Sequence, residues 1–272
     1  MNTLEVLFTP AEFGALAERD LSRTVCVVFD ILRATSSMIT ALANGAVAIL
    51  PVSAISEALA LRERQCDLLL AGERNGLRIR RDLTGGIDFD LANSPREFTR
   101  EIVRGKTIVM TTTNGTRALR ACQGASTVLV GSFLNLNAVA AVIEATPPGQ
   151  LLVVCSGTHE EASYEDALAA GALCDLIWQS WASAHVADSA QIARDLFLGT
   201  RGNLLAAMGH SRNARRLLSL PELADDVPYC LDLNTTRVLA VLRPDGRVIT
   251  KPGDERGGHG RRDVDGQSRS FY

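Results

Sequence analysis

Short apolar runs alternate with amphipathic segments along most of this chain. The runs have the length of buried strands and lie at 25–29, 47–52, 67–71, 107–110, 127–131 and 151–155. Helical patterns fall between and after them, at about 36–44, 53–64, 96–104, 116–122, 135–145 and 164–178. Strands that alternate with helices are typical of a parallel sheet with both faces covered. The pattern therefore predicts an α/β fold in three layers, αβα, with a mostly parallel sheet.

The pattern weakens towards the C-terminal end. Residues 190–220 favour helices, and 228–249 contain one or two strands. We interpret 1–250 as a single α/β domain, with two lobes at about 1–150 and 151–250 as an alternative. The segment 251–272 is dense in glycine and charge and cannot bury much apolar surface, which predicts a disordered tail.

Composition narrows the class of protein. The chain has 272 residues and a formal net charge of −3, so nothing draws it as a whole to nucleic acid or to an anionic membrane. Apolar runs stay shorter than the roughly 18 residues that a membrane helix needs. We expect a soluble cytoplasmic protein, and a homo-oligomer remains open. The six cysteines form no Cys-x-x-Cys pair, and the four histidines form no pair at i, i+4, which disfavours zinc.

Three of the apolar runs end in small polar residues just before a helical pattern. The run at 107–110 leads into TTNGTRA at 112–118, the run at 25–29 into DILRAT at 30–35, and the run at 151–155 into Ser156-Gly157 and then Glu165-Asp166. Helix N-termini favour anions, and the carboxyl ends of parallel strands line the ligand crevice of open α/β sheets. The sequence predicts one site at these ends for a small molecule that carries a phosphate or another oxyanion.

Taken singly, several of these residues have a purely structural explanation. Asp30 and the 93–95 segment could be helix caps, and Glu165-Asp166 could complement a helix dipole. Glu73 and Arg74 could form a surface ion pair. Their joint occurrence at strand ends and helix starts favours a functional site.

Several motifs, in order, resemble those of the ComB family, the 2-phosphosulfolactate phosphatases. They are DILRAT at 30–35, ALANGA at 41–46, AGERNG at 71–76, FDLANSP at 89–95, TTNGTRA at 112–118 and CSGT at 155–158, followed by Glu165-Asp166 and Ala170-Gly171. The resemblance spans roughly 25–175. It implies an αβα fold and a magnesium-dependent phosphatase that hydrolyses (R)-2-phospho-3-sulfolactate to (R)-3-sulfolactate and phosphate, a step of coenzyme M biosynthesis.

Residue roles follow as hypotheses. Asp30, Glu73 and Asp166 would hold Mg²⁺, since oxygen ligands suit a hard cation. Catalysis would use Asp30, Arg33, Arg117 and Asp166; whether water, Asp30 or Ser156 attacks phosphorus stays open. The substrate would be bound by Arg33, Thr35, Arg74, Asn93, Ser94, Thr112, Thr113, Asn114, Gly115, Thr116, Arg117, Ser156 and Gly157.

Three rival functions remain. The chain could act on another small phosphorylated hydroxy acid, pass the phosphoryl group to a second metabolite, or bind an anion without turnover. Labelled water would separate hydrolysis from transfer. Clustered carboxylates argue against a pure anion binder, because they repel the ligand unless a cation joins them.

Overall fold

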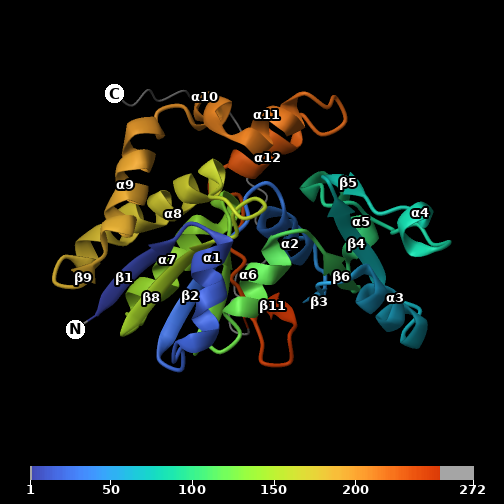
Figure 1. Cartoon of the computed structure of the whole chain (residues 1–272), viewed down its shortest axis with the longest axis horizontal. Coiled ribbons are helices and arrows are strands. Elements are labelled where there is room, and N and C mark those ends of the chain that lie inside the picture. Colours follow the sequence, from blue (N-terminus) through green and yellow to red (C-terminus); the bar gives the residue numbers. More distant parts are fainter. Residues whose placement is uncertain (1, 252–272) are drawn as a thin grey trace, which may run out of the picture.

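The computed structural model describes residues 2–251 and shows a central sheet with helices on both sides (Figure 1). The predicted tail lies outside the described residues except for Lys251. Strands from both proposed lobes lie side by side: β2 (Thr24–Phe29) pairs with β8 (Gln150–Cys155) over its whole length. The division into lobes therefore does not follow the sheet.

Eleven strands of residues 2–251 form one sheet in the order β5-β4-β6-β3-β11-β10-β7-β2-β8-β1-β9. The remaining strands are β1 (Thr3–Leu7), β3 (Ala48–Pro51), β4 (Leu69–Arg74), β5 (Leu77–Arg78), β6 (Thr107–Thr111), β7 (Thr127–Gly131), β9 (His185–Val186), β10 (Ala240–Leu242) and β11 (Val248–Thr250).

The sheet consists of two parallel blocks joined by an antiparallel hairpin, and β5 is added at one edge, antiparallel to β4. Strands β4, β6 and β3 form one block, and β7, β2, β8, β1 and β9 form the other. The hairpin β10–β11 fills the gap, with β10 antiparallel to β7 and β11 antiparallel to β3. The expectation of a mostly parallel sheet in a three-layer αβα fold is confirmed.

Twelve α-helices of the described chain connect and cover the strands. They are α1 (Pro10–Gly14), α2 (Ala34–Ala43), α3 (Ile55–Arg64), α4 (Arg81–Thr84), α5 (Arg100–Val103), α6 (Gly115–Ala121), α7 (Leu136–Ala145), α8 (Tyr164–Ile177), α9 (Asp188–Thr200), α10 (Leu204–Ala207), α11 (Arg212–Leu218) and α12 (Asp226–Leu231). In Figure 1, α10, α11 and α12 gather at one end of the molecule, between α8 and β5.

Alternation along β8 shows why both faces are covered. Leu151 and Val153 point into a core shared with α7 and α8, whereas Leu152 and Val154 point into a core shared with α2 and α6. Successive side chains of a strand face opposite sides, so an unbroken apolar run must be buried twice. The second core is closed by Phe13 of α1.

Several elements differ from the sequence-based expectation, and strands β5 and β9 and helices α1 and α4 were not predicted. The helix predicted at 96–104 is wrong as a single element, since a 3₁₀ turn at Pro95–Glu97 and the short α5 replace it. The N-terminal strand β1 was not predicted, although its alternating pattern puts Leu4 and Val6 in the core beside β8. Within residues 2–251, no helix has both the length and the apolar character needed to cross a bilayer.

Candidate functional site

A cleft opens where the carboxyl ends of β2, β4 and β6 meet the start of α8 and the residues after β8. Its empty space is about 710 Å³ with the open mouth included. Nine of the predicted site residues line it: Asp30, Arg33, Glu73, Asn93, Thr112, Thr113, Asn114, Gly157 and Asp166. The prediction that several strand ends share one crevice agrees with this arrangement.

Asp30 follows β2 directly and is held in place by the first turn of α2. Its Oδ1 accepts a hydrogen bond from the Ala34 amide at 3.0 Å, and the Thr35 hydroxyl donates to its carbonyl oxygen at 2.9 Å. Burial raises the pKa of the Asp30 carboxyl from 3.8 to about 6, and the carboxylates of Glu73 and Glu165 add to this. Thr35 thus supports Asp30 from within the fold. The N-cap residue of α2 is Arg33, but Asp30 accepts from the amide of the first helical residue, so a structural and a functional role both fit its contacts.

Asp166 lies in the first turn of α8 and joins the ends of β2 and β8. Its Oδ1 accepts from the Ile31 amide at 2.8 Å, and its Oδ2 accepts from the Ser156 hydroxyl and the Gly157 amide, both at 3.2 Å. Burial raises the pKa of Asp166 well above its ordinary value, and the charges of Glu165 and Asp30 raise it further. The charged form of this carboxylate is therefore unfavourable without a nearby cation.

Glu73 connects β4 with the loop after β6. Its Oε1 accepts from the amide and the hydroxyl of Thr113, each at 2.9 Å, and its Oε2 accepts from the Gly76 amide at 2.6 Å. The loop is also packed closely on Asp30, since a Cβ at Gly115 would lie 2.6 Å from Asp30 Oδ2. Only glycine fits where α6 begins.

Three polar oxygens in the cleft lining have no hydrogen-bond partner among the described residues. They are Asn93 Oδ1, Thr112 Oγ1 and Asn114 Oδ1. Buried polar atoms are nearly always paired in folded proteins, because an unpaired one loses its hydration without replacement. Three such atoms belong to residues that line one cleft, which is expected of a site that holds a ligand.

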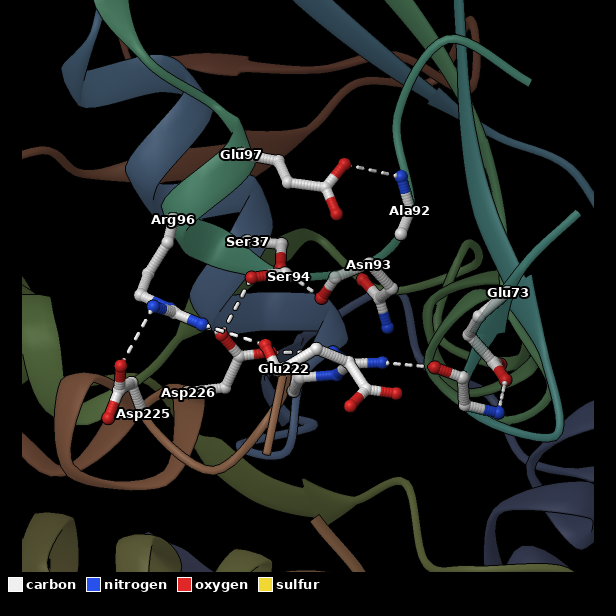
Figure 2. A network of polar contacts seen from close by, with 12 residues as sticks. Ser37, Glu73, Ala92, Asn93, Ser94, Arg96, Glu97, Glu222, Asp225 and Asp226 are labelled. Atoms are coloured by element: carbon white, nitrogen blue, oxygen red, sulfur yellow. Dashed lines mark hydrogen bonds and ion pairs between the residues drawn. The ribbon is translucent and has the colours of Figure 1, made fainter. Parts of the chain in front are cut away.

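Arg33 lines the cleft and is almost fully buried. It donates to Asp226 Oδ2 at 2.6 Å and to the carbonyl oxygen of Gly76 at 2.7 Å. Asp226, from α12, also accepts from the Ser94 hydroxyl at 2.6 Å and from Arg96 Nε at 2.9 Å (Figure 2). The sequence predicted that Ser94 binds substrate, but its hydroxyl donates to Asp226.

The two other predicted arginines point elsewhere. Arg74 donates to the Thr111 hydroxyl at 3.0 Å and to the Glu73 carbonyl at 2.7 Å. Arg117 pairs at 2.8 Å with Glu160 at the surface, and both side chains are exposed. As formed by residues 2–251, the cleft lining includes neither arginine, nor Thr35, Ser94, Gly115, Thr116 or Ser156.

The predicted metal ligands share the cleft without forming a compact ligand cluster. Among residues 2–251, no three His, Cys, Asp or Glu side chains lie close enough together to hold a metal ion. Asp30, Glu73 and Asp166 nevertheless line one cleft together with Asn93, Thr112 and Asn114. Every donor in this set is an oxygen, which is the chemistry that Mg²⁺ prefers.

Comparison with known proteins identifies the family. The profile of the family described as 2-phosphosulpholactate phosphatase matches residues 13–245. The chain belongs to the 2-phosphosulfolactate phosphatase family.

Three of its relatives are each named probable 2-phosphosulfolactate phosphatase. One from Caldanaerobacter subterraneus is 37% identical over 87% of this chain and 95% of its own. One from Deinococcus radiodurans is 38% identical over 81% and 88%, and one from Thermotoga petrophila is 38% identical over 75% and 82%. The family consists of phosphoric monoester hydrolases, and the ComB resemblance is confirmed.

Sequence reasoning missed part of this phosphatase cleft. Glu165 lines it with its carboxylate held by the Ser211 hydroxyl at 2.6 Å and the Asn213 amide at 2.8 Å. Asn213 and Arg216, both from α11, line it as well. Glu165 could have been found from its position beside Asp166. The α11 residues carry no local signal, because the fold alone brings them to the strand ends.

Proposed function

We propose that this member of the family hydrolyses (R)-2-phospho-3-sulfolactate to (R)-3-sulfolactate and phosphate with the help of Mg²⁺. Its relatives' names support the substrate, and family membership supports phosphate ester hydrolysis. The observation that carries the proposal is the composition of the cleft. Two arginines share it with three unpartnered oxygens and with the acids Asp30, Glu73, Glu165 and Asp166.

The charges of the cleft argue for a cation. Four carboxylates outnumber the guanidinium groups of Arg33 and Arg216, so an anionic phosphate would be repelled from the protein alone. Burial raises the pKa values of Asp30 and Asp166, and the neighbouring carboxylates raise them further. A magnesium ion bound among these carboxylates would attract the phosphate and would stabilise the charged forms of Asp30 and Asp166.

Asp30, Glu73 and Asp166 are the proposed magnesium ligands. Because no trio of ligating side chains in residues 2–251 would hold a metal alone, the remaining ligands would be waters and substrate oxygens. That division is usual for Mg²⁺ in phosphate chemistry. When bound, the ion supplies charge neutralisation at the phosphoryl group.

The chain's own side chains would bind and orient the substrate. The guanidinium of Arg33 has five N–H donors, and its two protein contacts leave several for a carboxylate, sulfonate or phosphate. The unpartnered Thr112 hydroxyl can donate to the same anion, and the free oxygens of Asn93 and Asn114 can orient an attacking water. Ser156 is buried and does not belong to the cleft lining formed by residues 2–251, which disfavours it as a nucleophile.

A place in coenzyme M biosynthesis belongs to the same proposal and rests on family membership alone. The experiment that tests the function is a phosphate-release assay with and without Mg²⁺. Its substrates are 2-phosphosulfolactate, 2-phospholactate, which lacks the sulfonate, and other phosphorylated hydroxy acids. We expect the fastest release from 2-phosphosulfolactate. Faster release from another acid would favour the alternative substrate, and binding of phosphate without any release would favour an anion-binding protein. In ¹⁸O-labelled water, hydrolysis puts one label into the phosphate, whereas transfer to a second metabolite does not.

A further inference from the structure

The carboxylate of Asp226 is fully buried and lies at the centre of a polar network outside the predicted motifs (Figure 2). One oxygen, Oδ2, accepts from Arg33, which lines the cleft. The other, Oδ1, accepts from Ser94 and Arg96. Helix α12 is thereby connected to two separate parts of the site.

The guanidinium of Arg33 is held by two hydrogen-bond acceptors. Asp226 binds one terminal nitrogen, and the carbonyl oxygen of Gly76, in the turn after β4, binds the other. A guanidinium held at both terminal nitrogens cannot rotate about its long side chain. Its planar fork is then fixed before the ligand arrives, which reduces the conformational entropy lost on binding.

The same carboxylate fastens the segment that presents Asn93. Ser94, the next residue, donates to Asp226, and the Asn93 carbonyl accepts from the Ser37 hydroxyl at 2.8 Å. Both bonds fix the backbone around Asn93, while its side-chain oxygen has no partner among the described residues. The network thus holds this cleft-lining residue without using its side-chain oxygen.

We propose that Asp226 is a positioning residue for substrate binding, which acts by holding the guanidinium of Arg33 at the cleft. It does not itself line the cleft formed by the described residues. The inference rests on the proposed function in that Arg33 is taken to bind an anionic group of the substrate. By this inference, a residue of α12 supports the site residues at the carboxyl ends of the strands.

The first test compares a variant that removes the charge of this carboxylate, and with it both ion pairs, with a variant that breaks only the ion pair to Arg96. Asp226→Asn removes the partner of Arg33 and keeps the size of the side chain. Arg96→Gln removes the half-exposed partner on the other oxygen and leaves the Arg33 contact intact. We expect KM for the phosphorylated substrate to rise roughly tenfold to a hundredfold in Asp226→Asn. It should stay within about twofold in Arg96→Gln, since partly exposed ion pairs contribute little. Equal KM values in Asp226→Asn and the unaltered protein would overturn the inference.

The second test is chemical rescue, which a general loss of stability cannot imitate. Arg33→Ala leaves a space bounded by Asp226 and the Gly76 carbonyl, and free guanidinium at a low, non-denaturing concentration should bind there and restore part of the activity. The double variant Arg33→Ala with Asp226→Asn should not respond. The ratio with and without guanidinium is taken within one preparation, so a smaller folded fraction cancels. Failure to rescue the single variant, or equal rescue of both, would contradict the proposal.

Binding of inorganic phosphate, followed by calorimetry in Mg²⁺, separates this inference from the proposed function. If the unaltered protein binds phosphate but releases none from any substrate, the proposed function fails while the role of Asp226 is still measured by affinity. We expect Asp226→Asn to weaken phosphate binding and Arg96→Gln to leave it unchanged. Unchanged affinity in Asp226→Asn would contradict the positioning role.

Discussion

Asp166 accepts a hydrogen bond from the backbone amide of Ile31, at 2.8 Å, and so ties the start of α8 to the residue next to Asp30. The contact joins two segments more than a hundred residues apart in the chain and keeps two buried acids at one strand end. The charge of Asp30 in turn raises the pKa of Asp166. The fold itself thus holds together carboxylates that repel each other, and it does so at the cleft.

Removal of divalent cations should abolish the activity. We expect a protein treated with EDTA to release no phosphate, and added Mg²⁺ to restore the rate, because the four acids of the cleft otherwise repel the substrate. The measurement is phosphate release after dialysis, with and without Mg²⁺. Full turnover in the chelated protein would show that the carboxylates work without a metal.

Asp30 should make the metal-free protein less stable as pH rises. The unfolded carboxyl loses its proton near 3.8, whereas the folded one keeps it up to about 6. Between these values the folded state binds more protons, so the free energy of unfolding falls with rising pH. Asp30→Asn has no such proton. In EDTA the free energy of unfolding of this variant should therefore fall less steeply with rising pH. At pH 7 the variant should be more stable than the unaltered protein by on the order of 2–3 kcal/mol.

Urea unfolding from pH 4 to 7 measures that difference. The control is Asp20→Asn, whose parent carboxyl is exposed and has a pKa lowered by the Ser22 amide. The free energy of unfolding of Asp20→Asn should fall between pH 4 and 7 as steeply as that of the unaltered protein. If Asp30→Asn and the unaltered protein lose stability in parallel, the buried charge of Asp30 is not the cause.

Arg33 and Arg117 should differ sharply, although the sequence predicted both to bind substrate. Arg33 lies buried at the cleft, and Arg33→Ala should lose on the order of 2–5 kcal/mol of transition-state binding, seen in kcat/KM. Arg117 is exposed and paired with Glu160, so Arg117→Ala should change kcat/KM by less than about threefold. An Arg117→Ala variant as impaired as Arg33→Ala would restore the assignment made from the sequence.

Gly171 should be essential for the packing of α8 against α9. A Cβ at this position would lie 1.9 Å from the carbonyl oxygen of Ala193, a backbone atom that cannot move aside alone. Gly171→Ala should therefore destabilise the protein by roughly 1–3 kcal/mol or more and lower Tm. Gly199→Ala, in α9 with open space around it, is the matched control and should be neutral or stabilise by about 0.5–1 kcal/mol. Equal Tm values for the two variants would contradict the close helix contact.

The sequence predicted best what depends on local patterns. Asp30 and Glu73 lie at the ends of apolar runs, and the direction of a parallel strand carries its last residues to the cleft. The six predicted strands are all present, because alternation and β-branched residues act within a few positions.

What depends on distant partners could not be read from the chain. The direction of Arg74 is set by Thr111, and that of Arg117 by Glu160. The hairpin β10–β11 enters the middle of the sheet, although it comes last in the described chain, and nothing local specifies its neighbours β7 and β3. The pairing of Asp226 with Arg33 spans 193 positions, so no local pattern indicates it.

The central claim is that the cleft around Asp30 hydrolyses the phosphate ester. It is tested most directly by phosphate release from 2-phosphosulfolactate in saturating Mg²⁺, measured for the unaltered protein and for Asp30→Asn at equal folded concentration. The account predicts turnover by the unaltered protein and a fall of at least about two orders of magnitude, roughly 2.7 kcal/mol of transition-state stabilisation, in the variant. The side-chain oxygen of asparagine can accept from the Ala34 amide as aspartate does, so a purely structural Asp30 would leave the rate unchanged. A folded Asp30→Asn protein with the unaltered rate would contradict the account.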